Sequence, residues 1–558
     1  MEAIVLSGAP VYVDHNLPPV EAIGIAGGRI AAAGSLREVS AALPSEARQL
    51  RASRAAFMPS FVDAHQHSFL VAVDPNTDVL HGAASTIPEM LLRLGSLVAQ
   101  SPPTSDRQWL RFHGYTPLDL AERRSPTAAE LDSACDDRPR HVLSRTFHES
   151  AVNGAGLEAL QIGRHTPDPP GGRIMRDRRG RPTGVLLEAA SFAAEATSRP
   201  KDPEGDWRPR LTAFGRMLLS HGITAIGDAA VPATVASQMV EVLAQAGVAA
   251  YPLLTGERID RPGLVAGATA KVLADGGEYC HLCMTPAQVG RVMRASARAS
   301  LGPEGAVARA LGRRSGMPHR EADRRWHTGI RYPAGADFAN VLTQAADAGS
   351  SVAVHAVGNG AVDAVLAARA ADPGRAARVP LRMEHAMVVD PALAARLGAE
   401  GIPVVTQPGF LAAYGHELNL VPVPTPLRLL PLRTLADAGV PLAFGSDYPA
   451  ADLSPWQSVA SAVHRRDRTG TRIHPDEELS IRQALIAHTS TAADVVGDAA
   501  AGRLAPGSPA TMIWCDADPY TANDAAALAG ITTLATWVTG ELRHGSAPPL
   551  AAGSAADA

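Results

Sequence analysis

The chain is poor in the features that define several classes of protein. Four cysteines among 558 residues are too few for a disulfide framework, so we expect a reducing, cytoplasmic setting. No run of about 18 apolar residues occurs, which predicts no membrane span. The start, MEAIVLSGAPVYVDHN, carries acids and lacks the basic leader of a secretion signal. The net charge of −5 argues against a partner bound through nucleic-acid phosphates.

The overall composition is that of a folded globular protein. Hydrophobic residues make up 46% of the chain and charged residues 19%, which is typical of globular proteins. The length exceeds that of one ordinary core, so we expect one large barrel with a smaller appended domain.

The two ends of the chain are rich in predicted strands. EAIVLSGAPVYV and EAIGIAGGRIAAAG alternate apolar and polar residues, and GRLAPGSPATMIWCDAD and ATWVTGELRHG do so near the other end. We expect residues 1–58 and 500–545 to pair into one small β-sandwich. The Ala/Gly/Ser/Pro tail, 546–558, is expected to be disordered.

The middle of the chain alternates short apolar strands with helical runs. The predicted strands are GITAIGDAA, GVAAYPLLT, ATAKVLADGG, SSVAVHAVG, VPLRMEHAM, GIPVVTQPG and VPLAFGSD. Repeated strand–helix units predict a parallel sheet, and eight of them close into a (β/α)₈ TIM-like barrel, here over residues 59–499. The active site of such a barrel forms where its strands end.

Two stretches are too long to be simple connections. Between His67 and Gly222 lie about 150 residues, which predicts an inserted α+β subdomain over 71–215. The second stretch, 278–328, carries nine arginines between Arg291 and Arg325 against three acids. It contains a predicted helix pair, and we expect it to form a lid.

Histidines two apart stand at the end of the apolar run AAFMPSFVDA. Side chains two apart on a strand point the same way, so His65 and His67 could converge on one metal ion. Strand-end histidines bonded to the backbone are the alternative, because an HxH pattern alone is a weak signal.

Four further candidates lie on later strands. Lys271 is buried in an apolar run, where a desolvated amine could add carbon dioxide and bridge two cations, unless its tip reaches the barrel rim. His355 and His385 end successive strands, and neutral imidazole suits zinc, iron or nickel. Asp447 could move protons beside a metal-activated water, or could simply occupy a turn.

The order of these motifs resembles a known family. The segments on which the resemblance rests are PSFVDAHQH, PDPPGGRIMRDRRGRPTGVLLEA, AKVLADGG, HAVGNGAVDAVL, RMEHA, TQPGF, PLRTLADAGVPLAFGSDYP and TWVTGELRHG. Together they resemble the amidohydrolase superfamily over nearly the whole chain, specifically the amidohydrolase-3 branch with its YtcJ-like proteins and N-substituted formamide deformylases.

The resemblance implies a metal-dependent amidohydrolase with a metallo-barrel and a β-sandwich built from both termini. It implies one or two divalent ions, zinc first and iron or manganese as alternatives. It implies hydrolysis of the C–N bond of an amide or formamide by metal-activated hydroxide, with Asp447 as metal ligand and proton shuttle. The implied ligands are His65 and His67 at the more buried metal, Lys271 as a carboxylated bridge, and His355 and His385 at the second metal, together with Asp447.

Substrate contacts are predicted in two places. His113, Tyr115, His148 and Asn153 lie in the insertion, the last two in a segment that resembles the GHxxxxN segment of the family. Gln407, Tyr414 and, more weakly, His416 follow a strand end; packing between domains is the alternative for all of them.

The chain departs from the family pattern at three places. Asn359 replaces the usual aspartate after HAxG, and we expect this to change the properties of the site rather than the set of metal ligands. Ser60 replaces a turn glycine. The 278–328 segment replaces a short continuation. Within it, Cys280 and Cys283 form a lone CxxC, a weak metal signal, although a cysteine could instead replace the lysine bridge. The arginines could receive an anionic substrate group or form a solvated helix face.

These departures leave the reaction open. Hydrolysis of a small-molecule amide is the main hypothesis. The same metal barrel could instead catalyse deamination, decarboxylation or isomerisation in a biosynthetic pathway, and a non-catalytic assembly protein is a third reading. We expect a small-molecule substrate and no nucleic-acid or membrane partner, with a homodimer as the default assembly.

Overall fold

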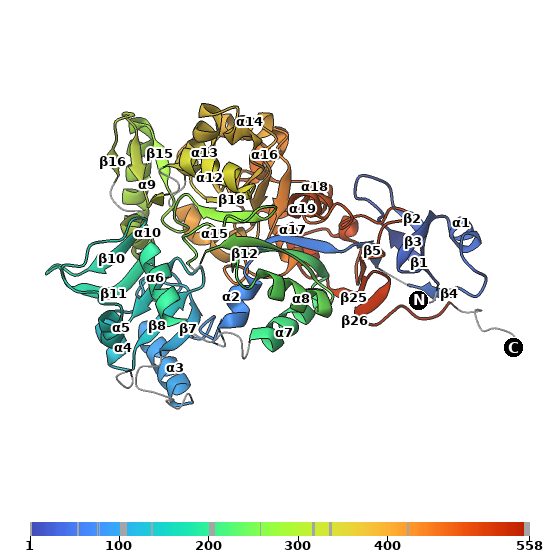
Figure 1. The fold of residues 1–558 in the computed structure, drawn as a ribbon, viewed down its shortest axis with the longest axis horizontal. Coiled ribbons are helices and arrows are strands. Elements are labelled where there is room, and N and C mark those ends of the chain that lie inside the picture. Colours follow the sequence, from blue (N-terminus) through green and yellow to red (C-terminus); the bar gives the residue numbers. More distant parts are fainter. Residues whose placement is uncertain are drawn as a thin grey trace.

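A parallel barrel of eight strands forms the centre of the computed structural model (Figure 1). The described residues are 3–52, 55–74, 76–77, 79–100, 109–134, 138–199, 207–256, 258–314, 318–333, 337–420 and 423–551. Around the barrel the strands follow the order of the chain: β6 (Phe61–Gln66), β12 (Ile223–Pro232), β13 (Ala249–Thr255), β14 (Thr269–Leu273), β18 (Ser351–Ala356), β19 (Leu381–His385), β21 (Val404–Thr406) and β23 (Leu442–Phe444). Every neighbouring pair is parallel, which confirms the predicted fold class.

These segments form strands because both of their faces are covered. Nine of the ten residues of β12, ITAIGDAAVP, are buried, and strands buried on both faces have nearly continuous apolar sequences. Helices supply the outer layer; in α8 the buried side chains Ala236, Met239 and Leu243 recur at helical spacing. The barrel helices are α7 (Trp207–Ser220), α8 (Ala236–Ala246), α12 (Phe338–Ala348), α13 (Asn359–Ala371), α14 (Pro391–Ala399), α16 (Leu432–Asp437), α17 (Pro455–His464), α18 (Ile481–Ala487) and α19 (Ser490–Val496).

The barrel closes where its first and last strands meet. Beyond β23, the backbone N–H of Asp447 donates to the carbonyl of His65 at 2.7 Å, and the N–H of His67 donates to the carbonyl of Tyr448 at 3.0 Å. The segments that follow β6 and β23 are therefore fixed against each other at one rim.

Both ends of the chain enter one eight-stranded sheet beside the barrel (Figure 1). β24 runs antiparallel to β5 and joins the two halves, while the N–H of Ala551 donates to the carbonyl of Gln49 at 2.9 Å. Residues 549–551 thus lie along β4, and 552–558 of the predicted disordered tail lie outside the described residues. The elements are β1 (Ile4–Val11), β2 (Val20–Ala26), β3 (Arg29–Gly34), α1 (Leu36–Ala41), β4 (Arg48–Arg51), β5 (Ala56–Pro59), β24 (Met512–Cys515), α20 (Ala525–Ala529), β25 (Thr533–Val538) and β26 (Glu541–Gly545).

An α+β insertion separates β6 from α7. Its five-stranded sheet has the order β10-β11-β9-β8-β7. The elements between the first two barrel strands are α2 (Ser68–Val73), α3 (Ile87–Ala99), β7 (Leu110–Tyr115), α4 (Ala128–Asp132), β8 (Arg140–Ser144), β9 (Glu149–Val152), α5 (Gly154–Ala159), β10 (Gly172–Arg176), β11 (Pro182–Glu188) and α6 (Ala189–Ser198).

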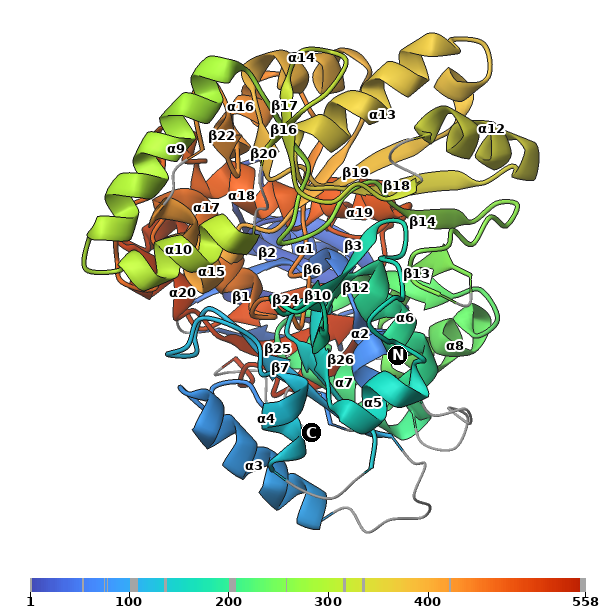
Figure 2. The same cartoon turned by 90° about the vertical axis from the view of Figure 1, so that its left-hand side faces the viewer.

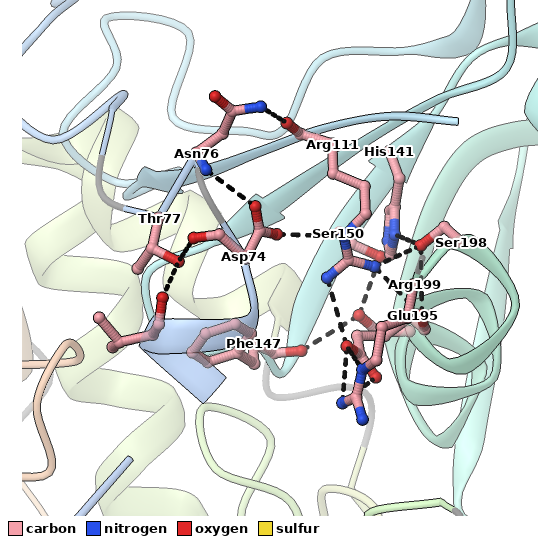
Figure 3. A network of polar contacts seen from close by, with 12 residues as sticks. Asp74, Asn76, Thr77, Arg111, His141, Phe147, Ser150, Glu195, Ser198 and Arg199 are labelled. Atoms are coloured by element: carbon pink, nitrogen blue, oxygen red, sulfur yellow. Dashed lines mark hydrogen bonds and ion pairs between the residues drawn. The ribbon is translucent and has the colours of Figure 1, made fainter. Parts of the chain in front are cut away.

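A buried arginine fastens this insertion to the chain that leaves the barrel (Figure 3). Arg111 Nε donates to Asp74 Oδ2 at 3.1 Å, just beyond α2, and Nη2 donates to Glu195 Oε1 at 3.2 Å on α6. Its Nη1 also donates to Ser198 Oγ at 2.6 Å. The guanidinium therefore joins its own strand, β7, to two other segments, the end of α2 and α6.

The segment from residue 278 to 328 forms a roof on the same side of the barrel as the insertion (Figures 1 and 2). We call it the roof below. It contains β15 (Leu282–Met284), α9 (Pro286–Leu301), α10 (Gly305–Arg314), β16 (His319–Arg320) and β17 (Trp326–Thr328), and α10 contacts α15 (Phe410–Leu420). A short pair, β20 (Val388–Val389) and β22 (Arg428–Leu429), lies after β19. None of the helices among the described residues has the length and apolar character needed to cross a bilayer.

The Arg111 network predicts a large loss of stability when the guanidinium is removed. Arg111→Ala leaves Asp74 and Glu195 buried without their main cationic partner, and we expect the free energy of unfolding to fall by about 3–5 kcal/mol. Urea or thermal unfolding measures the loss. The matched control is Arg181→Ala, which removes a 66% exposed side chain from an ion pair with Asp177 and should cost less than about 1 kcal/mol. Equal losses in the two variants would contradict the assigned role.

Candidate metal centre

Six candidate ligands gather at one rim of the barrel. His65 lies on β6, Lys271 on β14, His355 on β18 and His385 on β19, and Asp447 follows β23. Parallel strands present their carboxyl ends at the same rim, which explains why residues nearly 400 positions apart can meet. All five side chains, and that of His67, line one cavity.

Three of these side chains form the tightest group. Asp447 Oδ1 lies 3.0 Å from His67 Nε2 and 3.4 Å from His65 Nε2. One ligand atom from each of the three residues lies within 4.8 Å of the other two.

The remaining three side chains surround this group. Lys271 Nζ lies 3.5 Å from His65 Nε2. The His385 ring centroid is 4.9 Å from that of His65, and the His355 centroid is 4.5 Å from that of His385. The structure therefore brings together all six residues that the sequence singled out.

The imidazoles are oriented by hydrogen bonds on their outer nitrogens. His65 Nδ1 donates to Glu384 Oε2 at 2.5 Å, and His67 Nδ1 donates to the carbonyl of Ala229 at 2.9 Å. His385 Nδ1 donates to Gln407 Oε1 at 2.8 Å. Outer-nitrogen bonds of this kind fix the tautomer in which Nε2 is a free lone-pair donor.

Burial favours the neutral form of three of the imidazoles, those of His65, His355 and His385. Burial, and then the Lys271 amine, lowers the pKa of His65 to about 4, and burial lowers the pKa of His385 to about 3. The pKa of His355 also falls well below its ordinary value, mainly through burial. Neutral imidazole is the form that binds metal. His355 Nε2 is buried and has no hydrogen-bond partner in the structure, as expected of an atom placed for a ligand.

The pKa values of Lys271 and Asp447 are both shifted in the direction that suits a metal centre. Burial lowers the pKa of Lys271 to about 8, which favours a reactive neutral amine. Burial alone would raise the pKa of Asp447, but the adjacent imidazoles of His67, His65 and His385 lower it below its usual range. The carboxylate is therefore ionised at neutral pH.

Backbone strain concentrates at two of these residues. His385 has φ of 74° and Asp447 has φ of 54°, a region that non-glycine residues seldom adopt. Such conformations cost on the order of 1–3 kcal/mol each and cluster at functional sites. Four imidazoles, a carboxylate and a lysine amine of lowered pKa make a nitrogen- and oxygen-rich set, which fits a divalent ion such as zinc, iron or manganese.

The cavity above this group has largely apolar walls. Leu70, Phe192, Leu273, Met387 and Phe410 are among its lining residues. Polar groups enter from the insertion and the roof, including Arg145 and Glu278. Such a cavity suits a small, partly apolar molecule.

Comparison with known proteins agrees with this geometry. Residues 55–544 match the model of the amidohydrolase family. The chain belongs to that family. It is 29% identical over 547 residues to an N-substituted formamide deformylase of Arthrobacter pascens, covering 95% of this chain and 96% of the relative. It is 26% identical over 524 residues to the putative amidohydrolase YtcJ of Bacillus subtilis (strain 168), covering 90% and 91%.

A solved structure shares the fold of this amidohydrolase. An uncharacterized metal-dependent hydrolase from Pyrococcus horikoshii OT3 superposes with a TM-score of 0.65 at 20% identity, covering 93% of this chain and 98% of that one. At this identity the likeness concerns the fold alone. The match to the family model is what identifies the chain as an enzyme of the amidohydrolase family.

The predicted substrate contacts divide into two groups in the amidohydrolase structure. His148 and Tyr414 line the cavity. His148 Nδ1 donates to Glu188 Oε2 at 2.6 Å; burial alone lowers the pKa of His148, but the Glu188 carboxylate raises it above its ordinary value. The Tyr414 hydroxyl donates to the carbonyl of Ala450.

The other predicted contacts lie away from the cavity surface. The Asn153 side chain caps α5, accepting from the N–H of Gly156 at 2.9 Å, and is 1% exposed. The Tyr115 hydroxyl donates to Ser125 Oγ at 2.8 Å in the core of the insertion, and the His113 ring stacks on Phe147. None of these three side chains is among the residues that line the cavity, and their substrate contacts stay predictions.

Gln407 and His416 also act at a distance from the cavity. Gln407 holds His385, as described above, and does not line the cavity itself. His416 Nε2 donates to Glu304 Oε2 at 2.7 Å and joins α15 to the roof. The roof arginines Arg291, Arg294 and Arg298 are exposed, which matches the solvated helix face.

Several supporting residues were missed by the sequence reasoning. Glu384 holds His65, and Arg382 Nε donates to Glu384 Oε1 at 2.6 Å. Asp63 accepts from the N–H of Ser446 at 2.9 Å and from that of His65 at 3.3 Å. Each of these residues is charged and lies inside a predicted buried strand. Charged side chains are seldom fully buried without a partner, so their positions were the signal that could have identified them.

Asn359 contacts the roof, and this explains the departure from the family pattern. Its Nδ2 donates to the carbonyl of Cys283 at 2.8 Å, and its Oδ1 accepts from the N–H of Cys283 at 3.0 Å. An aspartate can accept here but cannot donate while ionised. The amide is therefore matched to the backbone of Cys283 on β15.

This contact predicts a pH-dependent penalty for Asn359→Asp. The ionised carboxylate loses the bond to the Cys283 carbonyl, so the free energy of unfolding should fall by about 1–3 kcal/mol at neutral pH. Once protonated, the introduced carboxyl group can donate, so its folded-state pKa is raised and the penalty should shrink as the pH falls toward about 4. Urea unfolding at several pH values measures this. Asn340→Asp, at an exposed site, is the control, and a penalty that grows in acid would contradict the assignment.

Proposed function

We propose that this amidohydrolase cleaves the C–N bond of an amide or formamide on a small molecule, using a divalent ion, zinc before iron or manganese. The supporting observation is the convergence of His65, His67, Lys271, His355, His385 and Asp447 on one cavity. When bound, the ion lowers the pKa of a coordinated water toward about 7 and polarises a carbonyl oxygen.

Three histidines, His65, His67 and His385, would hold the ion through Nε2, because their Nδ1 atoms are already engaged, and His355 would offer its unpartnered Nε2. The neutral Lys271 amine can add carbon dioxide at Nζ with release of one proton. The carbamate formed would then present two oxygens to one ion or to two.

Asp447 is assigned as the proton shuttle. Its Oδ1 faces His65 and His67, and its lowered pKa keeps it ionised before reaction. It accepts the proton of the attacking water and returns that proton to the departing nitrogen. The C–N bond then breaks with a neutral amine leaving, while the acyl carbon keeps the oxygen of water.

His148 is assigned to the substrate. Its Nδ1 is held by Glu188, which favours a protonated ring whose Nε2–H can donate to a carbonyl oxygen. The apolar walls suit an apolar substituent on the nitrogen, and the formamide deformylase relative makes N-substituted formamides the first compounds to test.

The proposal is tested by incubating the purified enzyme with N-substituted formamides that carry apolar groups. Formate and the free amine should appear in equal amounts and should cease to form after chelation. In Asp447→Asn, kcat should fall by about 10²–10⁴-fold because the shuttle is lost. Asp437→Asn, which changes a 66% exposed carboxylate, should leave the rate unchanged. Turnover without gain of one water would instead favour deamination, decarboxylation or isomerisation.

Glu384 is assigned as a positioning residue for His65. Glu384→Gln keeps the shape of the side chain but removes the charge that orients the imidazole and raises its basicity. We expect the Kd for the divalent ion to rise by about 10–100-fold. Competition with a metal-binding indicator measures this, and Glu541→Gln, at a 48% exposed position, is the control. An unchanged Kd would remove Glu384 from the metal centre.

A further inference from the structure

The roof contains a second cluster of metal-binding side chains, away from the barrel rim. Its small antiparallel sheet has β17 between β15 and β16. Cys283 on β15 is paired directly with His327 on β17. Residues paired in this way project to the same face of a sheet, so the thiol and the imidazole are neighbours by construction.

A carboxylate completes the group. Asp323, in the turn before β17, has Oδ2 3.0 Å from His327 Nε2, and Cys283 Sγ lies 4.0 Å from that same nitrogen. One ligand atom of each residue lies within 4.8 Å of the other two. Atoms at these separations can share one ion at bond lengths of about 2.0–2.3 Å with little movement.

The His327 imidazole of this cluster is oriented by a second histidine, His281. His327 Nδ1 lies 2.8 Å from His281 Nε2, and the two rings are stacked with centroids 5.1 Å apart. When Nδ1 donates to His281, the Nε2 lone pair of His327 points toward Cys283 and Asp323. This is the same arrangement that fixes the imidazoles of the barrel rim.

Burial and access both suit a bound ion. Cys283 is 8% exposed and His327 5% exposed, whereas the Asp323 side chain is 47% exposed and leaves an entry from solvent. Arg325 Nη1 donates to Cys283 Sγ at 3.6 Å. This guanidinium stabilises a thiolate but competes with a cation, and its side chain is exposed, so it can turn outward when an ion enters.

We propose that Cys283, Asp323 and His327 bind a divalent ion of the zinc class in the roof, separate from the ion of the barrel. Thiolate, imidazole and carboxylate together suit zinc, and a water from the exposed side fills the fourth position. On binding, the Cys283 thiol loses its proton to solvent and forms one sulfur–metal bond. The ion then links β15 to the turn that carries Asp323.

Cobalt(II) is the probe, because a thiolate ligand adds an intense near-ultraviolet charge-transfer band that histidine and carboxylate ligands do not. The full-length protein is stripped by chelation and titrated with Co²⁺. We expect this band in the unaltered chain and its complete loss in Cys283→Ser, with one equivalent less cobalt bound. This reading is independent of amide hydrolysis, so failure of the proposed function would not change it.

The matched control is Cys280→Ser, three residues away at the wall of the barrel cavity, which should keep the band. Asp323→Asn, at an exposed position, should fold normally. Its affinity for Co²⁺, measured by titration of the charge-transfer band, should fall by more than about tenfold. A band absent from the unaltered chain overturns the proposal. So does a band that survives Cys283→Ser, or one that disappears in Cys280→Ser, which would place the thiolate ligand in the barrel cavity.

Discussion

The hydrogen bond from the N–H of Asp447 to the carbonyl of His65 joins the last barrel strand to the first, and the site depends on it. It places the carboxylate beside the imidazoles whatever else the cavity contains. The strands can approach this closely only because Gly445 has no side chain: a Cβ there would lie 2.6 Å from His65 N. Asp63 secures the same junction, since it accepts from the backbone of both Ser446 and His65. Closure of the barrel and assembly of the centre are therefore one structural event.

The buried charges around the centre are arranged to favour one protonation state. Burial alone would raise the pKa of Glu384, but Arg382 and His65 lower it below its usual range. A histidine with only a structural role needs no ionised partner, because a backbone carbonyl satisfies Nδ1, as Val62 does for His488. A carboxylate at that position raises the basicity of the ring, which is useful only if Nε2 donates to something. Burying this charge costs several kcal/mol unless it is paired, so its presence is an argument for function.

Much of this arrangement was readable from the sequence, and the limits have physical causes. The barrel and the six rim residues could be predicted, because continuous apolar runs define buried parallel strands and a polar residue at the end of each run must lie at one rim. Four predicted substrate contacts do not line the cavity: His113, Tyr115 and Asn153 in the insertion, and Gln407 after β21. Asn153 precedes a short helix and could have been recognised as its cap. Tyr115 could not have been placed, because which face of a strand meets a cavity depends on packing between distant elements. The pairing of Cys283 with His327 was equally hidden, since a strand register joins residues 44 apart through a roof without a familiar pattern.

The roof and the barrel are linked at one position, and this link gives the departure at residue 359 its meaning. Asn359 begins α13, directly after the strand that carries His355, and its amide holds both backbone groups of Cys283. Asp275, at the end of the Lys271 strand, accepts from the N–H groups of Val357 and Gly358 and from that of His281 in the roof. Two barrel strands that carry candidate ligands therefore also carry the anchors of the roof. A change in the roof that moved β15 would act on the loop after His355, so the shape of the cavity cover and the position of a rim imidazole are coupled through a few short hydrogen bonds.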